Sequence, residues 1–159
     1  MALAIYAGTF DPVTHGHVDV LRRAHALFDE LEVAVAADPG RDTLFSTDER
    51  VELFEAARPE ASIPVRPFEG LLVEHAADRG AQVLVRGLRR TSDFDPEYQM
   101  AVANRRMEED LETVFLMTSP DYGHVSSTLV REIYRHGGDL EPFVPEAVRT
   151  RLQALPDRS

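Results

Sequence analysis

The sequence predicts one α/β domain, spanning residues 1–159, with a doubly wound, five-stranded parallel sheet. Short apolar runs alternate with longer segments of helical period, and strand-then-helix units in series favour a parallel sheet with helices on both faces. No repeat, low-complexity tract or Pro/Ser-rich linker divides the chain, and 159 residues suit a single core.

Five apolar runs have the length of strands that are buried on both faces. They are residues 3–7, 32–37, 63–67, 82–85 and 113–117. The N-terminal stretch 1–7 lacks a basic leader and runs directly into turn residues, so we expect it to form the first strand and not a signal peptide.

Helix signals lie between these runs. Thr14 precedes the first helical stripe, Ser46 with Glu49 forms a capping box at the second, and a third helix over residues 71–79 stops at Gly80. The apolar stripes of the first two helices are Val18, Leu21, Ala24 and Phe28, and then Val51, Phe54 and Ala57.

Three more helices are expected in the second half of the chain. Asp95 followed by Pro96 resembles a helix cap with proline at the first helical position, and this helix should run toward Glu109. The last two helices should start near Ser127 and Pro145.

Composition limits the classes of partner. A net charge of −11, from 28 acidic and 17 basic residues, disfavours a binder of nucleic acid or of anionic membranes. No apolar run of about 18 residues is present, so no membrane span is expected. The lack of cysteine excludes disulfides and thiolate chemistry and indicates a cytoplasmic protein. All basic residues are arginine, which fits either a saline habitat or biased genomic composition.

The loops that follow the predicted strands carry most of the unusual polar residues. They are residues 8–17, 38–41, 68–72, 86–90 and 119–128. Ligands of doubly wound sheets bind beyond the carboxyl ends of the strands. We therefore expect these loops to converge on one positively lined triphosphate pocket.

The first loop has the features of a phosphate cradle. Gly8 permits a turn close to a ligand, and residues 14–17, with the sequence Thr-His-Gly-His, stand where a helix begins and its free N–H groups point outward. His17 is the candidate donor in this cradle, the alternative being a solvent-facing residue of the first turn. A metal pair of His15 and His17 is a weaker alternative, because the other histidines are scattered.

Two later segments also indicate anion binding. Arg86, Arg89 and Arg90 lie within five residues of an otherwise acidic chain, which implies a concentration of negative charge on a ligand. Residues 126–128 offer three hydroxyl groups at another helix start, and capping explains only one of them.

Four motifs in order identify a resemblance: residues 8–12 (GTFDP), 14–17 (THGH), 86–89 (RGLR) and 125–128 (VSST) with Arg131 beyond them. From about residue 5 to residue 148 the chain resembles the bacterial phosphopantetheine adenylyltransferases, within the nucleotidyltransferase superfamily marked by the HxGH-type motif. The resemblance implies a Rossmann-like nucleotidyltransferase fold, transfer of AMP from ATP to 4′-phosphopantetheine, dependence on Mg²⁺ and a homohexamer.

The resemblance also implies the site residues. ATP would be bound by Thr9, Phe10, His17, Gly87, Leu88, Arg89, Glu97, Tyr122, Gly123, His124, Val125, Ser126, Ser127 and Thr128. The acceptor would be bound by Thr9, Arg41, Leu72 and Arg86, and no metal ligands are expected from the protein.

The expected chemistry is an in-line attack on the α-phosphorus without a covalent enzyme intermediate. A phosphate monoester is already an anionic nucleophile, so the protein needs only to align the substrates and neutralise charge. We assign His17 to donate to the α-phosphoryl oxygens, Thr9 to bridge the substrates by similarity, and Arg86 and Arg41 to hold the acceptor phosphate.

The chain departs from the family pattern at two of these positions. Arg41 stands where the family usually has lysine, and Pro96 stands where an aromatic residue is common. Structural alternatives also remain for single residues: Arg41 as an exposed loop cation, Glu97 as an acid favoured by the helix dipole, and Arg131 as a surface residue.

Other functions share part of this pattern. Enzymes of the same superfamily that adenylate nicotinamide mononucleotide, or transfer CMP to glycerol phosphate, would use the same histidine cradle. Arg41, Leu72 and Arg86 together favour phosphopantetheine over these acceptors. A non-catalytic nucleotide sensor of the universal-stress type would need phosphate-binding turns but not His17.

Overall fold

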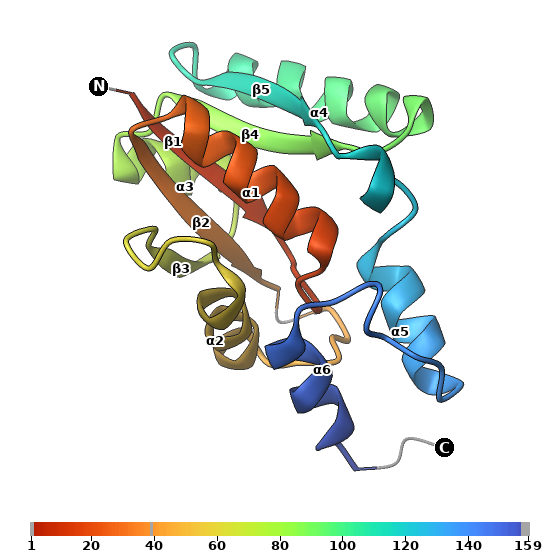
Figure 1. Ribbon diagram of the computed structural model, residues 1–159. Coiled ribbons are helices and arrows are strands. Elements are labelled where there is room, and N and C mark those ends of the chain that lie inside the picture. The colour runs from red at the N-terminus through yellow and green to blue at the C-terminus, as the bar shows by residue number, and fades with distance from the viewer. Residues whose placement is uncertain (1, 39, 157–159) are drawn as a thin grey trace.

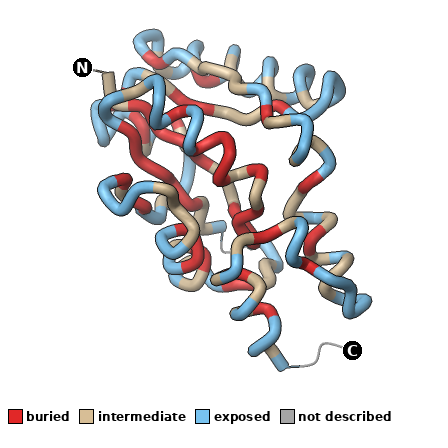
Figure 2. Tube along the Cα trace, viewed as in Figure 1, coloured by how far each residue is buried: buried red, intermediate tan, exposed pale blue. Residues whose placement is uncertain are grey.

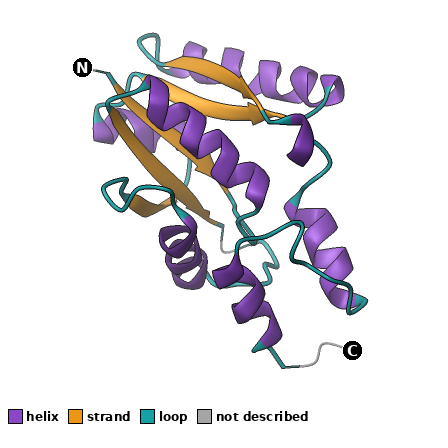
Figure 3. Ribbon diagram, in the orientation of Figure 1, coloured by secondary structure: helices purple, strands orange, loops and turns teal. Residues whose placement is uncertain are grey.

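A computed structural model describes residues 2–38 and 40–156; residues 1, 39 and 157–159 of the expected domain lie outside the described residues. Strands and helices alternate along most of the chain (Figure 3). The strands are β1 (Leu3–Gly8), β2 (Glu30–Ala37), β3 (Val65–Glu69), β4 (Val83–Leu88) and β5 (Glu112–Met117). The helices are α1 (His15–Leu27), α2 (Thr47–Ala57), α3 (Leu72–Arg79), α4 (Phe94–Met107), α5 (Ser127–Arg135) and α6 (Glu146–Gln153).

All five strands form one parallel sheet in the order β3-β2-β1-β4-β5. The central strand β1 pairs with both neighbours, so that Ile5 lies opposite Glu32 on one side and Leu84 on the other. The chain builds outward from β1 to β3 and then returns to build from β4 to β5. This reversal between β1 and β4 is where doubly wound sheets bind ligands. The predicted α/β class and parallel sheet are confirmed.

The two faces of the sheet bury separate cores, because side chains alternate along each strand. Tyr6 of β1 points into a large cluster beneath α1 and α2, whereas Ile5 points into a smaller one with Val73 of α3. Figure 1 shows α1 in front of the sheet and α3 behind it. In Figure 2 the buried residues concentrate along the central strands and the inner side of α1.

Each predicted strand differs from the observed one by one to three residues at one end or both, and the differences at the third and fourth strands matter for the site. The third strand was expected at residues 63–67, but β3 begins after Pro64, whose carbonyl accepts the N–H of Val33 at 2.8 Å and which has no N–H of its own to pair. The fourth strand is longer than expected: β4 continues through Gly87 to Leu88, which pairs with Met117 of β5. Residues 86–88 therefore belong to the sheet and not to a loop.

The start of α4 also differs from the prediction. A 3₁₀ turn over Thr91–Asp93 leads into α4 at Phe94, so that Pro96 occupies the third helical position, where no N–H is needed. The cause is Asp93, whose carboxylate accepts the N–H groups of Arg89 and Arg90, each at 3.2 Å. This turn draws the start of α4 toward the end of β4.

Helix α2 buries a wider face than predicted: Phe54 is buried, and Val51 and Ala57 pack against the core as expected. Its buried residues are Arg50, Leu53 and Phe54, while Val51 is only half-buried. The capping box of Ser46 and Glu49 is present as expected. An arginine thus occupies a position on the core-facing side of the helix. None of the helices in the described residues is long and apolar enough to cross a bilayer.

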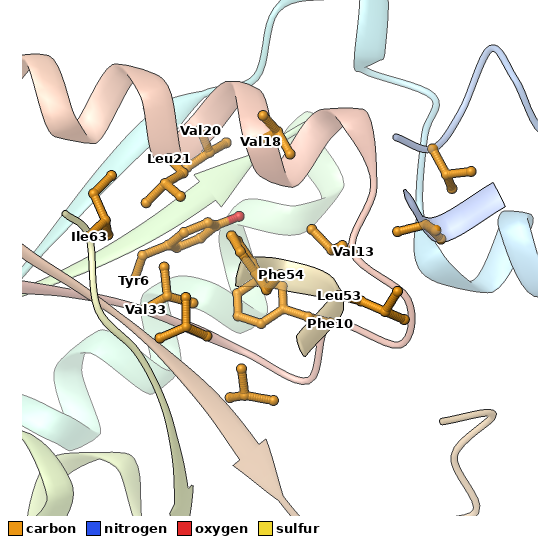
Figure 4. Packing of buried hydrophobic residues seen from close by; sticks show 14 of the residues in the cluster. Tyr6, Phe10, Val13, Val18, Val20, Leu21, Val33, Leu53, Phe54 and Ile63 are labelled. Atoms are coloured by element: carbon orange, nitrogen blue, oxygen red, sulfur yellow. The ribbon is translucent and has the colours of Figure 1, made fainter. Parts of the chain in front are cut away.

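Phe54 is expected to be a major contributor to stability. Its ring is fully buried and meets the rings of Tyr6 and Phe10 edge-on, as Figure 4 shows. Phe54→Ala should lower the free energy of unfolding by about 3–5 kcal/mol, because it removes buried contacts and leaves a cavity. Urea titration followed by circular dichroism measures the loss. The control is Leu27→Ala at an exposed position, which should change stability by less than about 0.5 kcal/mol; equal losses in the two variants would refute the assignment.

Candidate active site

Thr14 and His17 hold each other at the start of α1. Thr14 is the N-cap: its Oγ1 accepts the N–H of His17 at 3.3 Å, and its own N–H donates to Nδ1 of the His17 ring at 3.0 Å. This is a capping box in which histidine takes the place usual for Glu or Gln. Because Nδ1 accepts this hydrogen bond, the neutral ring carries its proton on Nε2, which is left to donate to a ligand.

The surroundings of His17 keep its ring neutral. Burial lowers the pKa of His17 to about 3, and the positive charges of Arg89 and Arg86 act in the same direction. The Nε2–H group is therefore a neutral hydrogen-bond donor at physiological pH. It can stabilise negative charge that grows on a phosphoryl oxygen without giving up its proton.

This protonation state predicts a histidine that does not titrate between pH 8 and 4.5. Unfolded His17 has its ordinary pKa near 6.5, so below that pH the unfolded chain takes up a proton that the folded chain refuses until about pH 3. The stability that this residue contributes is complete above pH 6.5 and declines as the pH falls. We expect the Cε1–H resonance, assigned by its loss in His17→Gln, to stay in place over this range. Wild type should also lose more unfolding free energy from pH 7 to 5 than the variant; a midpoint near 6.5 in the NMR titration would exclude the neutral ring.

Phe10 packs its ring against the imidazole of His17. Its buried ring meets the imidazole edge-on, with ring centroids 4.9 Å apart, and its backbone adopts a positive φ of 51°. A Cβ on residue 8 would come within 2.9 Å of the Phe10 ring, so only glycine fits at Gly8. The GTF sequence thus forms a tight turn that seats one aromatic ring under the histidine.

Arg86 and Glu97 form a bidentate ion pair where β4 and α4 meet. Nη2 and Nε of Arg86 donate to the two carboxylate oxygens at 2.7 and 2.9 Å, and Nη1 donates to the carbonyl of Ala7 at 2.8 Å. The hydrogen bonds that Arg86 donates to Glu97 raise the pKa of Arg86 above its usual range. The guanidinium is therefore a fixed positive charge between the ends of β1 and β4.

A cavity of about 350 Å³ opens beside His17 at the carboxyl ends of β1 and β4. We call it the histidine cavity. The predicted site residues that line it are Thr9, Phe10, His17, Arg86, Gly87, Arg89, Glu97, Val125, Ser126, Ser127 and Thr128. Segments that lie more than 100 residues apart in the sequence thus meet at one site.

Four predicted ATP-binding residues do not line this cavity. The Leu88 side chain is buried in the sheet, and Gly123 ends a 3₁₀ turn (Pro120–Tyr122). The ring of Tyr122 lies against the ring of His15, with the ring centroids 5.7 Å apart, and the ring of His124 lies against that of Phe143, with the centroids 6.0 Å apart.

A second cavity, of about 710 Å³, lies between the ends of β2 and β3 and helix α4. We call it the α4 cavity. It contains the predicted acceptor residues Arg41 and Leu72, and its wall is largely apolar, with Phe68, Met100 and Met107 among its residues. Thr9, Arg86 and Glu97 border both cavities. These three residues, which we call the shared wall, lie where the two adjoining cavities meet, so the predicted loops converge on two neighbouring cavities at one edge of the sheet.

Arg41 and Arg131 both have defined partners. Nη1 of Arg41 donates to Oγ1 of Thr9 at 3.0 Å, which brings the second loop onto the shared wall. Nη1 of Arg131 donates to the carbonyl of Asp11 at 2.6 Å and lies 3.8 Å from its carboxylate. Arg131 is half-buried and is therefore not a simple surface residue, whereas Arg41 is an exposed loop cation, as the structural alternative required, that nevertheless contacts Thr9.

Several residues near the two cavities were missed in the sequence. Asn104 is buried on α4 and lines the α4 cavity, and Asp93 lines the histidine cavity. Asp11 accepts the N–H groups of Leu44 and Phe45 at 2.8 and 2.9 Å. A buried amide on an otherwise exposed helix leaves no periodic signal, whereas Asp11 stands inside the GTFDP motif and could have been included with it.

The possible metal pair of His15 and His17 does not converge. His15 points its Nε2 toward the carbonyl of Glu141 at 3.2 Å, while His17 directs Nδ1 to Thr14. Among residues 2–38 and 40–156, no group of three or more His, Asp or Glu side chains is placed to hold a metal ion.

The chain was compared with known families and relatives. Residues 5–133 match the family model described as cytidylyltransferase-like. A phosphopantetheine adenylyltransferase of Caldanaerobacter subterraneus is 49% identical over 153 residues, covering 96% of each chain. Enzymes of the same name from Alkaliphilus metalliredigens and Desulfitobacterium hafniense are 44% and 47% identical over 100% and 96% of this chain and 100% and 94% of their own.

One solved structure has a related fold. A lipopolysaccharide core biosynthesis protein from Thermoplasma volcanium superposes with a TM-score of 0.55 at 20% identity, covering 75% of this chain and 97% of that one. At this identity the likeness concerns the fold alone.

Proposed function

Because the chain belongs to the cytidylyltransferase-like family and, within it, to the phosphopantetheine adenylyltransferases, we propose that its two cavities hold ATP and 4′-phosphopantetheine side by side. The enzyme is a nucleotidyltransferase of coenzyme A biosynthesis: AMP passes from ATP to the acceptor, giving dephospho-coenzyme A and pyrophosphate. The observation that carries the assignment of the cavities is their shared wall, formed by Thr9, Arg86 and Glu97.

The histidine cavity is the ATP site. The N-terminal turn of α1 presents His17, the end of β4 presents Arg89, and α5 begins with the hydroxyl groups of residues 126–128. Helix starts and arginines attract phosphate. Ser126 caps α5 by accepting the N–H of Leu129, and Ser127 donates to the carbonyl of Pro12. Among the three hydroxyl groups, that of Thr128 is held only by Arg131, at 3.2 Å, and is the most available to a ligand.

The α4 cavity is the phosphopantetheine site. An apolar wall suits the pantetheine arm, and Leu72 stands at the start of α3 within that wall. Arg41 and Arg86 border the same cavity and can present positive charge to the phosphate at its inner end. Arginine at position 41 keeps the charge that lysine would supply and adds a planar fork that already contacts Thr9.

Transfer then needs no protein nucleophile. A phosphate oxygen of the acceptor attacks the α-phosphorus, one phosphorus–oxygen bond forms in line with the bond to the leaving pyrophosphate, and that bond breaks. His17 donates from Nε2 to the α-phosphoryl oxygens as their charge grows, and Thr9 aligns the substrates across the shared wall.

Magnesium is the metal that this reaction uses. Mg²⁺ prefers phosphate oxygens and water and needs only one or two protein carboxylates. Asp93 and Glu97 are the carboxylates that line the histidine cavity, and both already pair with arginine or with backbone N–H groups. These two carboxylates would be the protein groups nearest to the ion, and the chemistry that it would supply is neutralisation of charge on the leaving pyrophosphate.

The assembly and location follow from the same assignment. Helix α4 exposes several large apolar side chains: Phe94, Tyr98, Met100, Val102 and Met107. Phe94, Tyr98 and Val102 recur at every fourth position along one side of α4, whereas Met100 and Met107 line the α4 cavity. Exposed apolar side chains on one helix side favour an interface between subunits, and a homohexamer is the assembly that we propose for it. Light scattering during gel filtration measures the subunit number. The site of action is the cytoplasm.

An acceptor panel tests the proposed function. Purified protein with ATP and Mg²⁺ should convert 4′-phosphopantetheine to dephospho-coenzyme A, detected by chromatography and mass. Pantetheine without its phosphate should not react, since Arg41 and Arg86 then have no anion to hold. Preference for nicotinamide mononucleotide, or for glycerol phosphate with CTP, would overturn the acceptor assignment.

A further inference from the structure

Arg50 is an arginine buried in the core beneath the active site. Its side chain is among the largest that are fully buried in the described residues, although the sequence places it on an ordinary amphipathic helix. Among those residues no carboxylate lies within 4.0 Å of its guanidinium, so it has no ion-pair partner. Burying such a charge is costly and adds less stability than an apolar side chain of the same size would.

The guanidinium instead bridges three pieces of backbone. Nη1 donates to the carbonyl of Thr9 at 2.7 Å and to that of Ala36 at 2.8 Å, and Nε donates to the carbonyl of Phe45 at 3.2 Å. Nη2 donates to Oγ1 of Thr47 at 3.0 Å. These acceptors belong to the loop after β1, the end of β2 and the start of α2.

These bonds fix the part of the backbone that the sheet cannot hold. Pairing between β1 and β2 ends at Gly8 and Val35, so the peptide of Thr9 lies just beyond the ladder. The next residue, Phe10, has a positive φ, and the chain turns sharply there. The orientation of the Thr9 peptide therefore depends on its bond to Arg50.

Thr9 in turn stands on the shared wall. Its hydroxyl accepts from Arg41 at 3.0 Å, and the residue borders both cavities. Asp11 anchors the backbone of residues 44 and 45 from the other side. One guanidinium thus sets the positions of the loop that carries Thr9 and of the segment that leads from Arg41 to α2.

We propose that Arg50 is a positioning residue for adenylyl transfer, acting through the Thr9 carbonyl to hold the Thr9 hydroxyl between the two substrates. The proposal rests on the proposed function. A lysine cannot reproduce the bridge, because a single ammonium group cannot span acceptors that the planar fork reaches in separate directions.

A double-mutant cycle with Thr9 tests this role. Arg50→Lys should lower kcat about 10-fold or more, normalised to ATP-binding sites counted by calorimetry, and change the KM for ATP less than about 3-fold. In a Thr9→Ala background the same change should alter kcat less than about 3-fold, because the group that Arg50 positions is already gone. The control is Arg58→Lys. Arg58 caps the C-terminal end of α2 and donates to the Ile63 carbonyl at 2.9 Å, and it lines neither cavity. The kcat of this variant should match that of wild type.

Each other outcome overturns the proposal. Full kcat in Arg50→Lys, or an equal loss in both Thr9 backgrounds, would make Arg50 a structural residue only. Arg50→Gln is a second variant, in which kcat should likewise fall about 10-fold or more while the KM for ATP changes less than about 3-fold. Loss of ATP binding in both Arg50 variants would show that Arg50 is needed for folding and not for positioning Thr9. Failure of the proposed function is seen separately, because wild type would then form no dephospho-coenzyme A.

Discussion

Replacing His17 with alanine is expected to lower kcat by about 100-fold or more while the affinity for ATP changes little. The neutral ring donates from Nε2 to oxygens whose charge grows only as the α-phosphorus reacts, so its contribution is largest in the transition state. Removing one donor of this kind costs about 3–4 kcal/mol in other enzymes. Steady-state kinetics and calorimetry with ATP measure the two quantities.

The matched control for this variant is His124→Ala. His124 stands in the last loop, packs against Phe143 and does not line the histidine cavity. Its turnover should fall much less than that of His17→Ala. An unchanged kcat in His17→Ala would remove His17 from the mechanism, and a matching loss of ATP affinity would make it a binding residue for the ground state.

Replacing Arg86 with alanine should weaken the acceptor far more than it weakens ATP. Arg86 is a fixed cation on the shared wall, and its loss removes charge-assisted hydrogen bonds to the acceptor phosphate and leaves Glu97 unpaired. Two such bonds correspond to about 3 kcal/mol, or roughly 100-fold in the dissociation constant for phosphopantetheine. Calorimetry with each substrate alone gives the ranking.

Arg90→Ala is the control for charge in the same segment. Arg90 is exposed and lines neither cavity, although it follows Arg89 directly. It should bind both substrates as wild type does. If Arg86→Ala instead weakened ATP more than phosphopantetheine, the two cavities would have to exchange their assignments.

The architecture was predictable because it depends on patterns that short segments display. Buried parallel strands are continuous apolar runs in the sequence. Gly8, Ser46 and Gly80 indicate turns and helix caps, because their residue types favour those conformations. The motif residues also meet at one edge of the sheet as expected, because the carboxyl ends of parallel strands share that edge.

What could not be predicted depends on contacts between distant segments. The early start of α4 is set by Asp93 accepting two N–H groups after β4, and the buried position of Arg50 is set by carbonyls from three other segments. Arg86 and Glu97, which border both cavities, likewise form an ion pair between two separate elements, β4 and α4. None of these pairings has a period or a spacing that the sequence displays.

The overall charge of the chain and the charge at its two cavities have opposite signs. The net charge of −11 disfavours binding of polyanions in general, whereas Arg41, Arg86 and Arg89 border the two cavities in which we propose that phosphates bind. Attraction of small anionic substrates would therefore depend on this local arrangement of arginines and not on the overall charge.

Exchange of labelled pyrophosphate into ATP tests direct transfer across the shared wall most directly. If the acceptor attacks the α-phosphorus itself, label enters ATP only when phosphopantetheine is present, and His17→Ala slows the exchange along with turnover. Exchange with ATP and pyrophosphate alone would reveal a covalent adenylyl-enzyme, and no exchange with all substrates present would show that the two cavities do not form one reaction site.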